Sequence, residues 1–394
     1  MICFETEYMK INRTLLLIIG MWPYQQSKLA QLQIILCNGA LISIIIFQFT
    51  TFLTTENTLV FVIDVLSETL FFLLHLMYYN MFYFNNHVVR HTLEQIQHVY
   101  NELKNENEIA IIENYGYEGK RYTIVLTFIG ICPIVIFLVQ PWCPQIFNVS
   151  LLVNISQPHP PAYITTEYFV DEEKYFYLIL LHANVVFILG LIIEIAIGTM
   201  FIVFNKWICG MFRIASYRIE KAMEINVAQT IDLKNDTMIY NEIIHAVNIH
   251  RKAITIIKFL MSNFEGPLFC LIICIVCCLS LNLYRIFQIV SFRRSTGELI
   301  VHCLFANFMI AIIFISNYVA QEILDHNNHV FATVYSMRWY KTPLYIQRMI
   351  LFLLQKGTKT FSLKIGLFSA SLEGTATLLS ASLSYFTVLC STSQ

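Results

Sequence analysis

Seven apolar stretches constrain this chain more than any other feature of its sequence. Each is close to the roughly 20 residues that a helix needs to cross a hydrocarbon core about 30 Å thick. Only 13% of the residues are charged, whereas soluble domains usually carry about a quarter. The sequence therefore predicts an all-α integral membrane protein, a single seven-helix membrane domain with transmembrane helices at about 31–53, 59–83, 122–142, 176–204, 257–283, 298–321 and 371–391.

The basic residues indicate which ends of these helices face the cytoplasm. Cytoplasmic loops carry an excess of Lys and Arg, and the chain contains 25 such residues. All but four lie in four segments: the one before the first apolar stretch, and those that join the second stretch to the third, the fourth to the fifth, and the sixth to the seventh. This distribution predicts a cytoplasmic N-terminus and an extracellular C-terminus. The exceptions are Lys174 and three residues that we assign to one outside loop and that argue against this orientation: Arg285, Arg293 and Arg294.

The longest predicted cytoplasmic portions, at about 205–256 and 322–370, anchor the helices below the membrane. "GP" at 266–267 interrupts the fifth stretch, so we expect the residues before it to continue as helix into the cytoplasm. In "PLYIQRMILFLLQK" at 343–356 the apolar residues recur on one face, which predicts an amphipathic helix. Such a helix suits packing between subunits or onto the inner leaflet of the bilayer.

Several functional classes lack support in the sequence. The net charge is −1 and the basic residues form no contiguous patch, so we expect no nucleic-acid partner. Because the sequence has no Gly-rich phosphate loop, no Gly-x-Ser-x-Gly elbow and no clustered catalytic carboxylates in its hydrophilic loops, we expect neither an enzyme nor a cofactor. The histidines are scattered, which predicts no metal site. The N-terminus shows no cleaved signal peptide.

Two glycosylation sequons support the predicted orientation. "NVS" at Asn148 and "NIS" at Asn154 fall in the longest predicted outside loop, 143–175, so both asparagines are predicted glycosylation sites. The sequons at Asn12 and Asn235 fall on the predicted inside, where they would not be used. Charge therefore carries more of the orientation argument than the sequons do.

The second apolar stretch carries ionisable residues along one helical face. Asp64, Glu68, Phe71 and His75 recur at i, i+4, i+7 and i+11. Ionisable residues at membrane depth are costly and mark functional sites by default. One interpretation is a polar and aromatic wall of a ligand cavity or ion path. The other is a buried hydrogen-bonded face that holds neighbouring helices together, and the sequence favours neither.

Polar residues also occur in the outer halves of two other stretches. His182 and Asn184 lie in the fourth, and His302, Phe305 and Met309 share a face of the sixth. Small-ligand sites combine an apolar, aromatic lining with a few polar groups that fix orientation. His182, Asn184 and His302 are candidates for those polar groups, although hydrogen bonding between helices is the stronger interpretation of each one alone.

The last stretch carries a stripe of hydroxyl residues. It begins at "SASLEG", where Ser371 can cap a helix and Glu373 lies in its first turn. Five hydroxyl residues follow with spacings of three or four, which places them on one face. They either pack against neighbouring helices or face water in a pore, and spacing alone favours packing slightly: Thr377, Ser380, Ser384, Thr387 and Ser391.

Four segments resemble insect odorant receptors of the tuning, ligand-binding kind. They are "GMWPYQ" at 20–25, "HRKAITIIKFL" at 250–260, "PLYIQRMILFLLQKGTKTFSLKIGLFSASLEG" at 343–374 and "SLSYFTVL" at 382–389. The resemblance implies a subunit of a four-chain, non-selective cation channel that is gated by volatile odorants. It also implies a shared co-receptor in a heterotetramer, and a multi-pass location in the plasma membrane of the olfactory neuron dendrite.

The resemblance further implies functional residues. The last helix lines the pore, with Ser384 and Ser391 on the pore face and the gate at Val388 and Thr392. Because Thr392 is polar where the co-receptor is apolar, much of the apolar ring is expected to come from co-receptor subunits. The odorant pocket is expected in the outer half of the membrane, and depth and helical face select its residues: Glu68, Phe71, Phe72, Phe137, His182, Asn184, His302, Phe305 and Met309.

Three alternatives remain at this point. A G-protein-coupled receptor would have an extracellular N-terminus, and the sequence lacks that family's Asp/Glu-Arg-Tyr and Asn-Pro signatures. A gustatory-type receptor would end in Gln-Phe where this chain has Ser391 and Thr392. A transporter or enzyme would need inverted repeats, broken helices or a catalytic motif, none of which the sequence shows.

Overall fold

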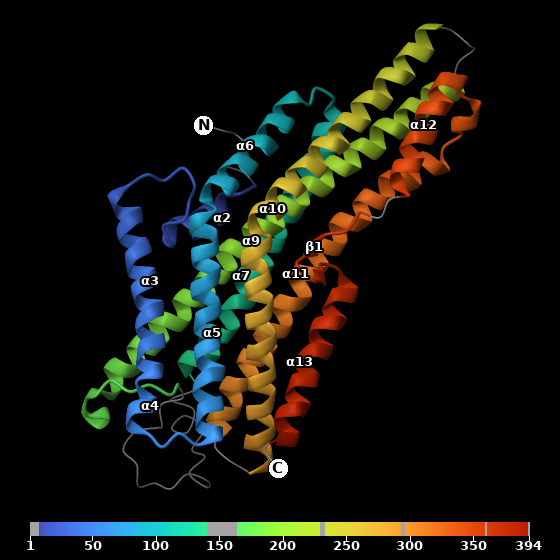
Figure 1. Ribbon diagram of the computed structural model, residues 1–394. Coiled ribbons are helices and arrows are strands. Elements are labelled where there is room, and N and C mark those ends of the chain that lie inside the picture. The colour runs from blue at the N-terminus through green and yellow to red at the C-terminus, as the bar shows by residue number, and fades with distance from the viewer. Residues whose placement is uncertain (1–7, 140–163, 229–232, 293–295, 359–360, 393–394) are drawn as a thin grey trace.

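The computed structural model describes residues 8–139, 164–228, 233–292, 296–358 and 361–392, and within these ranges it is built almost entirely of helices (Figure 1). A short 3-10 turn and a two-stranded hairpin precede the last helix. The elements in chain order are α2 (Lys10–Ile18), α3 (Lys28–Phe49), α4 (Thr51–Thr54), α5 (Leu59–Phe84), α6 (Asn86–Glu102), α7 (Glu106–Val139), α9 (Glu172–Ala228), α10 (Leu233–Ser291), α11 (Thr296–Ser336), η2 (Trp339–Lys341), α12 (Leu344–Gly357), β1 (Lys364–Ile365), β2 (Phe368–Ser369) and α13 (Leu372–Thr392).

The prediction of an all-α membrane protein is confirmed. In the described ranges six helical stretches are long and apolar enough to cross a membrane: Lys28–Thr54, Leu59–Phe84, Glu106–Val139, Glu172–Glu224, Asp236–Ser291 and Gly297–Ser336. With 21 residues, α13 has the length to cross as well. It is absent from these six because its Ser and Thr residues lower its hydropathy.

The helix α9 forms the centre of the bundle. It packs against α2, α3, α5, α7, α10 and α11, and Trp207, Phe204 and Phe212 are among the largest fully buried side chains. A helix that contacts neighbours on most sides is mainly apolar around its circumference, and the buried polar residues of α9, such as Asn205 and Lys206, have polar partners on the neighbouring helices. The approach of α7 to α9 is so close that a Cβ on Gly130 would lie 2.3 Å from Cδ1 of Ile195.

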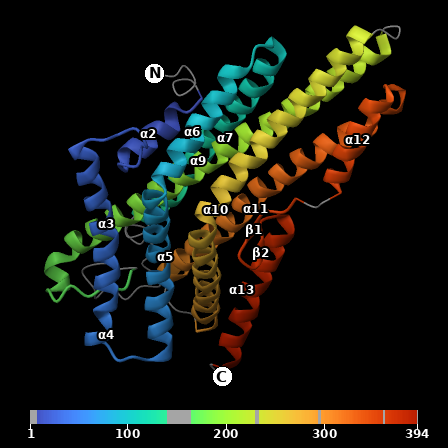
Figure 2. The ribbon, with the colours of Figure 1, turned by 45° about the horizontal axis from the view of Figure 1, so that its top comes forward.

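Three helices extend far beyond the thickness of a bilayer. α9 has 57 residues, α10 has 59 and α11 has 41, and at a rise of about 1.5 Å per residue each exceeds 60 Å. Their extensions run together to one end of the molecule, where α12 joins them (Figures 1 and 2). The predicted helical continuation before residue 267 is confirmed, because Pro267 lies inside α10 without ending it.

The amphipathic helix predicted at 343–356 corresponds to α12. Ile346 and Ile350 are buried, whereas Leu351 and Phe352 are exposed. In the subunit the helix therefore buries one apolar edge and leaves other apolar side chains uncovered. It packs on α11.

A hairpin that the sequence did not predict positions the start of α13. Lys364 pairs with Ser369 and Ile365 with Phe368 in antiparallel register, and Gly366 in the turn has a φ of +57° that favours glycine. The predicted cap is confirmed, since the Oγ of Ser371 accepts a hydrogen bond from the N–H of Gly374 at 3.2 Å.

The N-terminal and C-terminal helices lie toward opposite ends of the helix bundle. α13 ends at the same end of the bundle as the start of α5, with the end of α10 between them, whereas α2 lies near the opposite end of α5 (Figures 1 and 2). Arg285 departs from its predicted position. It was assigned to an outside loop, but it lies within α10 and is 1% exposed, because it forms ion pairs across the bundle.

Candidate ligand-binding site

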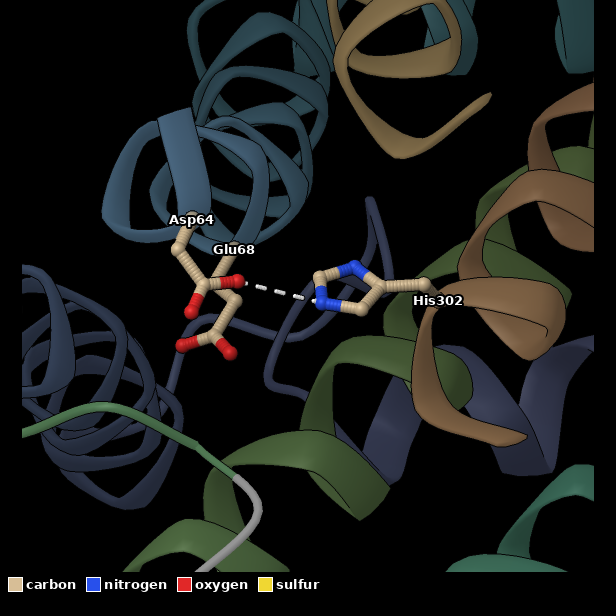
Figure 3. Close-up of side chains that lie close together, drawn as sticks. All are labelled: Asp64, Glu68 and His302. Carbon is tan, nitrogen blue, oxygen red and sulfur yellow. Dashed lines mark ion pairs between the residues drawn. The ribbon is translucent and has the colours of Figure 1, made fainter. Parts of the chain in front are cut away.

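Four charged or polar side chains from three helices meet near the start of α5. Nε of Arg285 on α10 donates to Oδ1 of Asp64 on α5 at 2.7 Å, and Nε2 of His302 on α11 lies 3.2 Å from the same oxygen. In Figure 3 the carboxylate of Asp64 points toward the imidazole of His302, and the carboxylate of Glu68 lies next to that of Asp64. Nη2 of Arg285 also lies 3.5 Å from Glu298, so the cluster joins α5, α10 and α11.

Further hydrogen bonds fix the orientation of this cluster. Glu68 is buried, and its Oε2 accepts from the N–H of Thr165 at 2.8 Å and from Nε2 of Gln48 at 3.5 Å. Nδ1 of His302 lies 2.9 Å from Oδ1 of Asn282 on α10. Buried polar groups with such partners hold a defined geometry, because leaving them unpaired in a low-dielectric interior is costly.

A stack of aromatic rings lies directly next to the polar cluster. The rings of Phe71 and Phe305 are stacked at 4.0 Å, and those of Phe137 and Phe187 at 4.1 Å. Phe71 and Phe187 are 5.9 Å apart and nearly parallel, so the four rings form one continuous stack from α5, α7, α9 and α11. Phe72 meets the edge of Phe71 at 5.5 Å.

The structure brings together most of the nine predicted ligand-binding residues. Glu68 and His302 belong to the polar cluster, and Phe71, Phe72, Phe137 and Phe305 belong to the aromatic stack. All six are buried, as is Met309, which lies one turn from Phe305 on α11. The face shared by Glu68, Phe71 and His75 therefore points into the helix bundle.

His182 and Asn184 have other surroundings. Nε2 of His182 lies 2.9 Å from Oγ of Ser43 on α3, and Nδ1 lies 2.6 Å from the hydroxyl of Tyr168. Oδ1 of Asn184 is buried and has no hydrogen-bond partner in the described ranges. His182 thus holds α9 against α3 in this structure.

A cavity of about 560 Å³ lies between α5, α7, α9, α10 and α11, and residues of the β1–β2 hairpin and Leu378 of α13 complete its lining. Its lining is mainly apolar, with Tyr78, Glu194 and Asn317 among the polar exceptions. Within the described chain, none of the nine predicted residues lines it. Phe308 connects the two regions, because it lines the cavity and its ring lies 5.6 Å from that of Phe71.

One residue that lines this cavity, Glu194, stands out in the sequence but was not predicted as a site residue. Glu194 is an ionisable residue inside the apolar run "LIIEIAIG" at 191–198, which is the type of residue that marks functional positions in membranes. Its Oε2 is buried and lacks a hydrogen-bond partner among the residues that the structure describes. The remaining lining residues are ordinary apolar side chains, which no local pattern distinguishes from core.

The predicted pore residues lie on the outer face of α13. The five hydroxyl residues of the stripe and the proposed gate residue Val388 are exposed, Val388 by 56%. Within the subunit α13 packs instead through a different face, where the Oγ of Ser280 on α10 donates to the carbonyl of Ser382 at 3.0 Å. The stripe therefore does not hold α13 to its own subunit. Asn148 and Asn154 lie outside the described residues.

Comparison with known proteins identifies a family that covers most of the chain. The family model described as "7tm Odorant receptor" matches residues 57–383. A comparison with curated proteins found no match.

Two solved structures share the fold over nearly the full length. The insect olfactory receptor OR5 of Machilis hrabei in complex with eugenol is 15% identical, with a TM-score of 0.77 over 99% of this chain and 98% of that chain. A second structure of OR5 is 16% identical, with a TM-score of 0.75 over 98% of this chain and 97% of that one. At these identities the likeness shows a common fold.

Proposed function

Because this chain belongs to the 7tm odorant receptor family, we propose that it binds a volatile odorant and opens a non-selective cation channel together with a co-receptor. The family match over residues 57–383 is the observation that carries this proposal. The chain would be one subunit of a heterotetramer in the plasma membrane of olfactory neurons. A ligand shifts such a channel toward its open state only if it binds that state more tightly.

The proposed odorant site comprises the aromatic stack and the polar cluster beside it. Phe71, Phe305 and Phe137 supply apolar surface from three helices, and Glu68 and His302 supply polar groups at one side. An apolar lining with a few polar groups is typical of small-molecule sites. The cavity beside Phe308 is free volume next to the stacked rings. The rings can move into this volume when a ligand enters between them.

The exposed face of α13 supports a pore-lining role. Its hydroxyl stripe is not used for packing within the subunit, and each of Thr377, Ser384 and Ser391 donates back to a carbonyl of its own helix. These hydroxyls need no protein partner and can face water. In the proposed channel Val388 narrows the pore, and Ser391 and Thr392 lie at its outer mouth.

The ion pair of Arg285 supports the proposed orientation, with the N-terminus inside and the C-terminus outside. Arg285 was one of the basic residues that argued against it, but its charge is neutralised by Asp64 inside the bundle. The positive-inside rule concerns basic residues in loops near helix ends. A buried, paired arginine does not weaken the excess of basic residues on the proposed cytoplasmic side.

Variants of the aromatic stack test the proposed binding site. We expect Phe305→Leu and Phe71→Leu, expressed with the co-receptor, to raise the half-maximal concentration of an activating volatile by about fivefold or more, since loss of a stacked ring and its packing costs ~1–3 kcal/mol. Phe352→Leu is the matched control because Phe352 is exposed on α12. Unchanged responses of both stack variants would place the odorant site elsewhere.

A further inference from the structure

We propose that Asp64, Glu68 and His302 form a binding site for a divalent transition-metal ion of the Zn²⁺ type. The scattered histidines of the sequence predicted no metal site, but folding brings His302 to two carboxylates that lie more than 230 positions earlier. One ligand atom from each of the three residues lies within 4.8 Å of the others. The site shares Glu68 and His302 with the odorant site proposed above, but its binding of Zn²⁺ requires no odorant and is measured separately.

The spacing of these donor atoms is close to what a tetrahedral ion requires. Zn²⁺ binds His nitrogen and carboxylate oxygen at about 2.0–2.2 Å, so two of its ligand atoms lie about 3.4 Å apart. Nε2 of His302 and Oδ1 of Asp64 are already separated by 3.2 Å. The carboxylate of Glu68 lies on the same side of the imidazole (Figure 3). Small side-chain rotations are therefore sufficient to place all three donors around one centre.

The hydrogen bonds of His302 leave its metal-binding nitrogen available. Nδ2 of Asn282 donates to the carbonyl of Cys278 at 2.8 Å, so its Oδ1 faces His302 as an acceptor. Nδ1 of His302 must then carry the proton of that 2.9 Å hydrogen bond. Nε2 faces the carboxylate of Asp64. Because both atoms carry lone pairs, either a second proton or a metal ion must lie between Nε2 and that carboxylate. Metal-binding histidines are commonly oriented by such a hydrogen bond on the other ring nitrogen.

Gln48 supplies an independent indication of a ligand at this position. Its side chain is fully buried, and its Oε1 has no hydrogen-bond partner in the described part of the chain. Its Nε2 makes only a long contact of 3.5 Å with Oε2 of Glu68. Because a buried, unpaired amide oxygen is costly, rotation of the amide toward a bound cation would satisfy it and complete a four-ligand site.

The charge of the site also favours a cation. Asp64, Glu68 and Glu298 bring three carboxyl groups to the site, whereas Arg285 brings one guanidinium. Oδ1 of Asp64 accepts from Arg285, and because a carboxylate oxygen has more than one lone pair it can also face a metal ion. A set of one imidazole and two carboxylates suits Zn²⁺ better than Ca²⁺ or Mg²⁺, which prefer oxygen ligands alone.

The test is Zn²⁺ uptake by the purified full-length receptor in detergent, measured by competition with a chromophoric chelator. We expect one equivalent of Zn²⁺ per chain. Loss of even an outer-shell partner weakens metal binding by about 10–100-fold, so His302→Gln and Glu68→Gln are each expected to weaken it by at least about tenfold. Zn²⁺ is also expected to raise the melting temperature of the wild-type receptor but not of these variants.

The matched control is His98→Gln, which removes another histidine next to a carboxylate. His98 lies 3.2 Å from Glu102 on α6, far in sequence from the cluster, and its variant is expected to bind Zn²⁺ as the wild type does. Glu68→Gln keeps the shape and the acceptor for Thr165, so it decides the question if His302→Gln does not fold. The proposal would be overturned if the wild type bound no Zn²⁺, or if Glu68→Gln bound it as tightly as the wild type. A proton would then lie between the ring of His302 and Asp64.

Discussion

Lys206 offers the most direct test of how the interior of this bundle tolerates charge. Its side chain is 3% exposed, and its Nζ lies 2.5 Å from Oε1 of Glu322 and 2.9 Å from Oε2 of Glu118. Nδ2 of Asn205 donates to the other oxygen of Glu322 at 2.8 Å. The ammonium joins α9 to α7 and α11, so its removal leaves one carboxylate in the interior without its counter-charge.

The expected loss follows from the exposure of the two partners. Removing one partner of a buried ion pair costs about 3–5 kcal/mol. In Lys206→Met, Glu118 is 42% exposed and can be hydrated, whereas Glu322 is 15% exposed and keeps only Asn205. We therefore expect the lower end, about 3 kcal/mol. A melting temperature shifts by about 2–4 °C per kcal/mol in chains of 150–250 residues and by less in longer ones, so a decrease of roughly 3–6 °C is expected.

The assay is thermal unfolding of the purified receptor in detergent, followed by tryptophan fluorescence. The double variant Lys206→Met/Glu322→Gln removes both charges, and we expect it to be more stable than Lys206→Met alone, because a buried charge without a partner costs more than an absent pair. Lys221→Met is the control, since Lys221 lies 3.7 Å from Glu242 in a partly exposed pair and should change stability by under about 1 kcal/mol. A double variant no more stable than the single one would refute the reasoning.

Three further predictions concern packing, gating and orientation. Gly130→Val should lower the melting temperature modestly, because a Cβ at this position would lie 2.3 Å from Cδ1 of Ile195, whose side chain must then turn toward the cavity that both residues line; an unchanged melting temperature would show that Ile195 moves without cost. Val388→Ser, expressed with the co-receptor, should increase spontaneous current or alter ion permeability by removing an apolar constriction, and unaltered gating and permeability would return the hydroxyl stripe to a packing role. Asn148→Gln and Asn154→Gln should each increase gel mobility by removing a glycan, and glycosidase-insensitive wild-type mobility would count against an external loop 143–175.

The helices could be predicted from sequence because their determinants are local. Each apolar stretch falls on a helix, and Ser371 caps α13 through a residue three positions away. The helix α2 and the hairpin β1–β2 were not predicted. α2 has nine residues, too few for a sustained helical pattern of apolar residues, and the strands have only two residues each. Their formation depends on packing against distant segments.

The candidate site could be predicted only in part. One helical period placed Asp64, Glu68 and Phe71 on a common face, and this face is buried. The partner of Asp64 was missed, because Arg285 follows it by 221 positions and lies beyond an apolar stretch where a loop was expected. The cavity near Glu194 was missed for the same reason, since its volume arises between several helices and the hairpin, and no single element shows it.

The central claim is tested most directly by recording current from cells that express this chain with and without a co-receptor, under a panel of volatiles and with G-protein signalling blocked. The account predicts rapid, non-selective cation currents evoked by at least one volatile, present only when both chains are expressed and unaffected by the block. Responses that disappear when G-protein signalling is blocked, or no response to any volatile in the presence of the co-receptor, would contradict it.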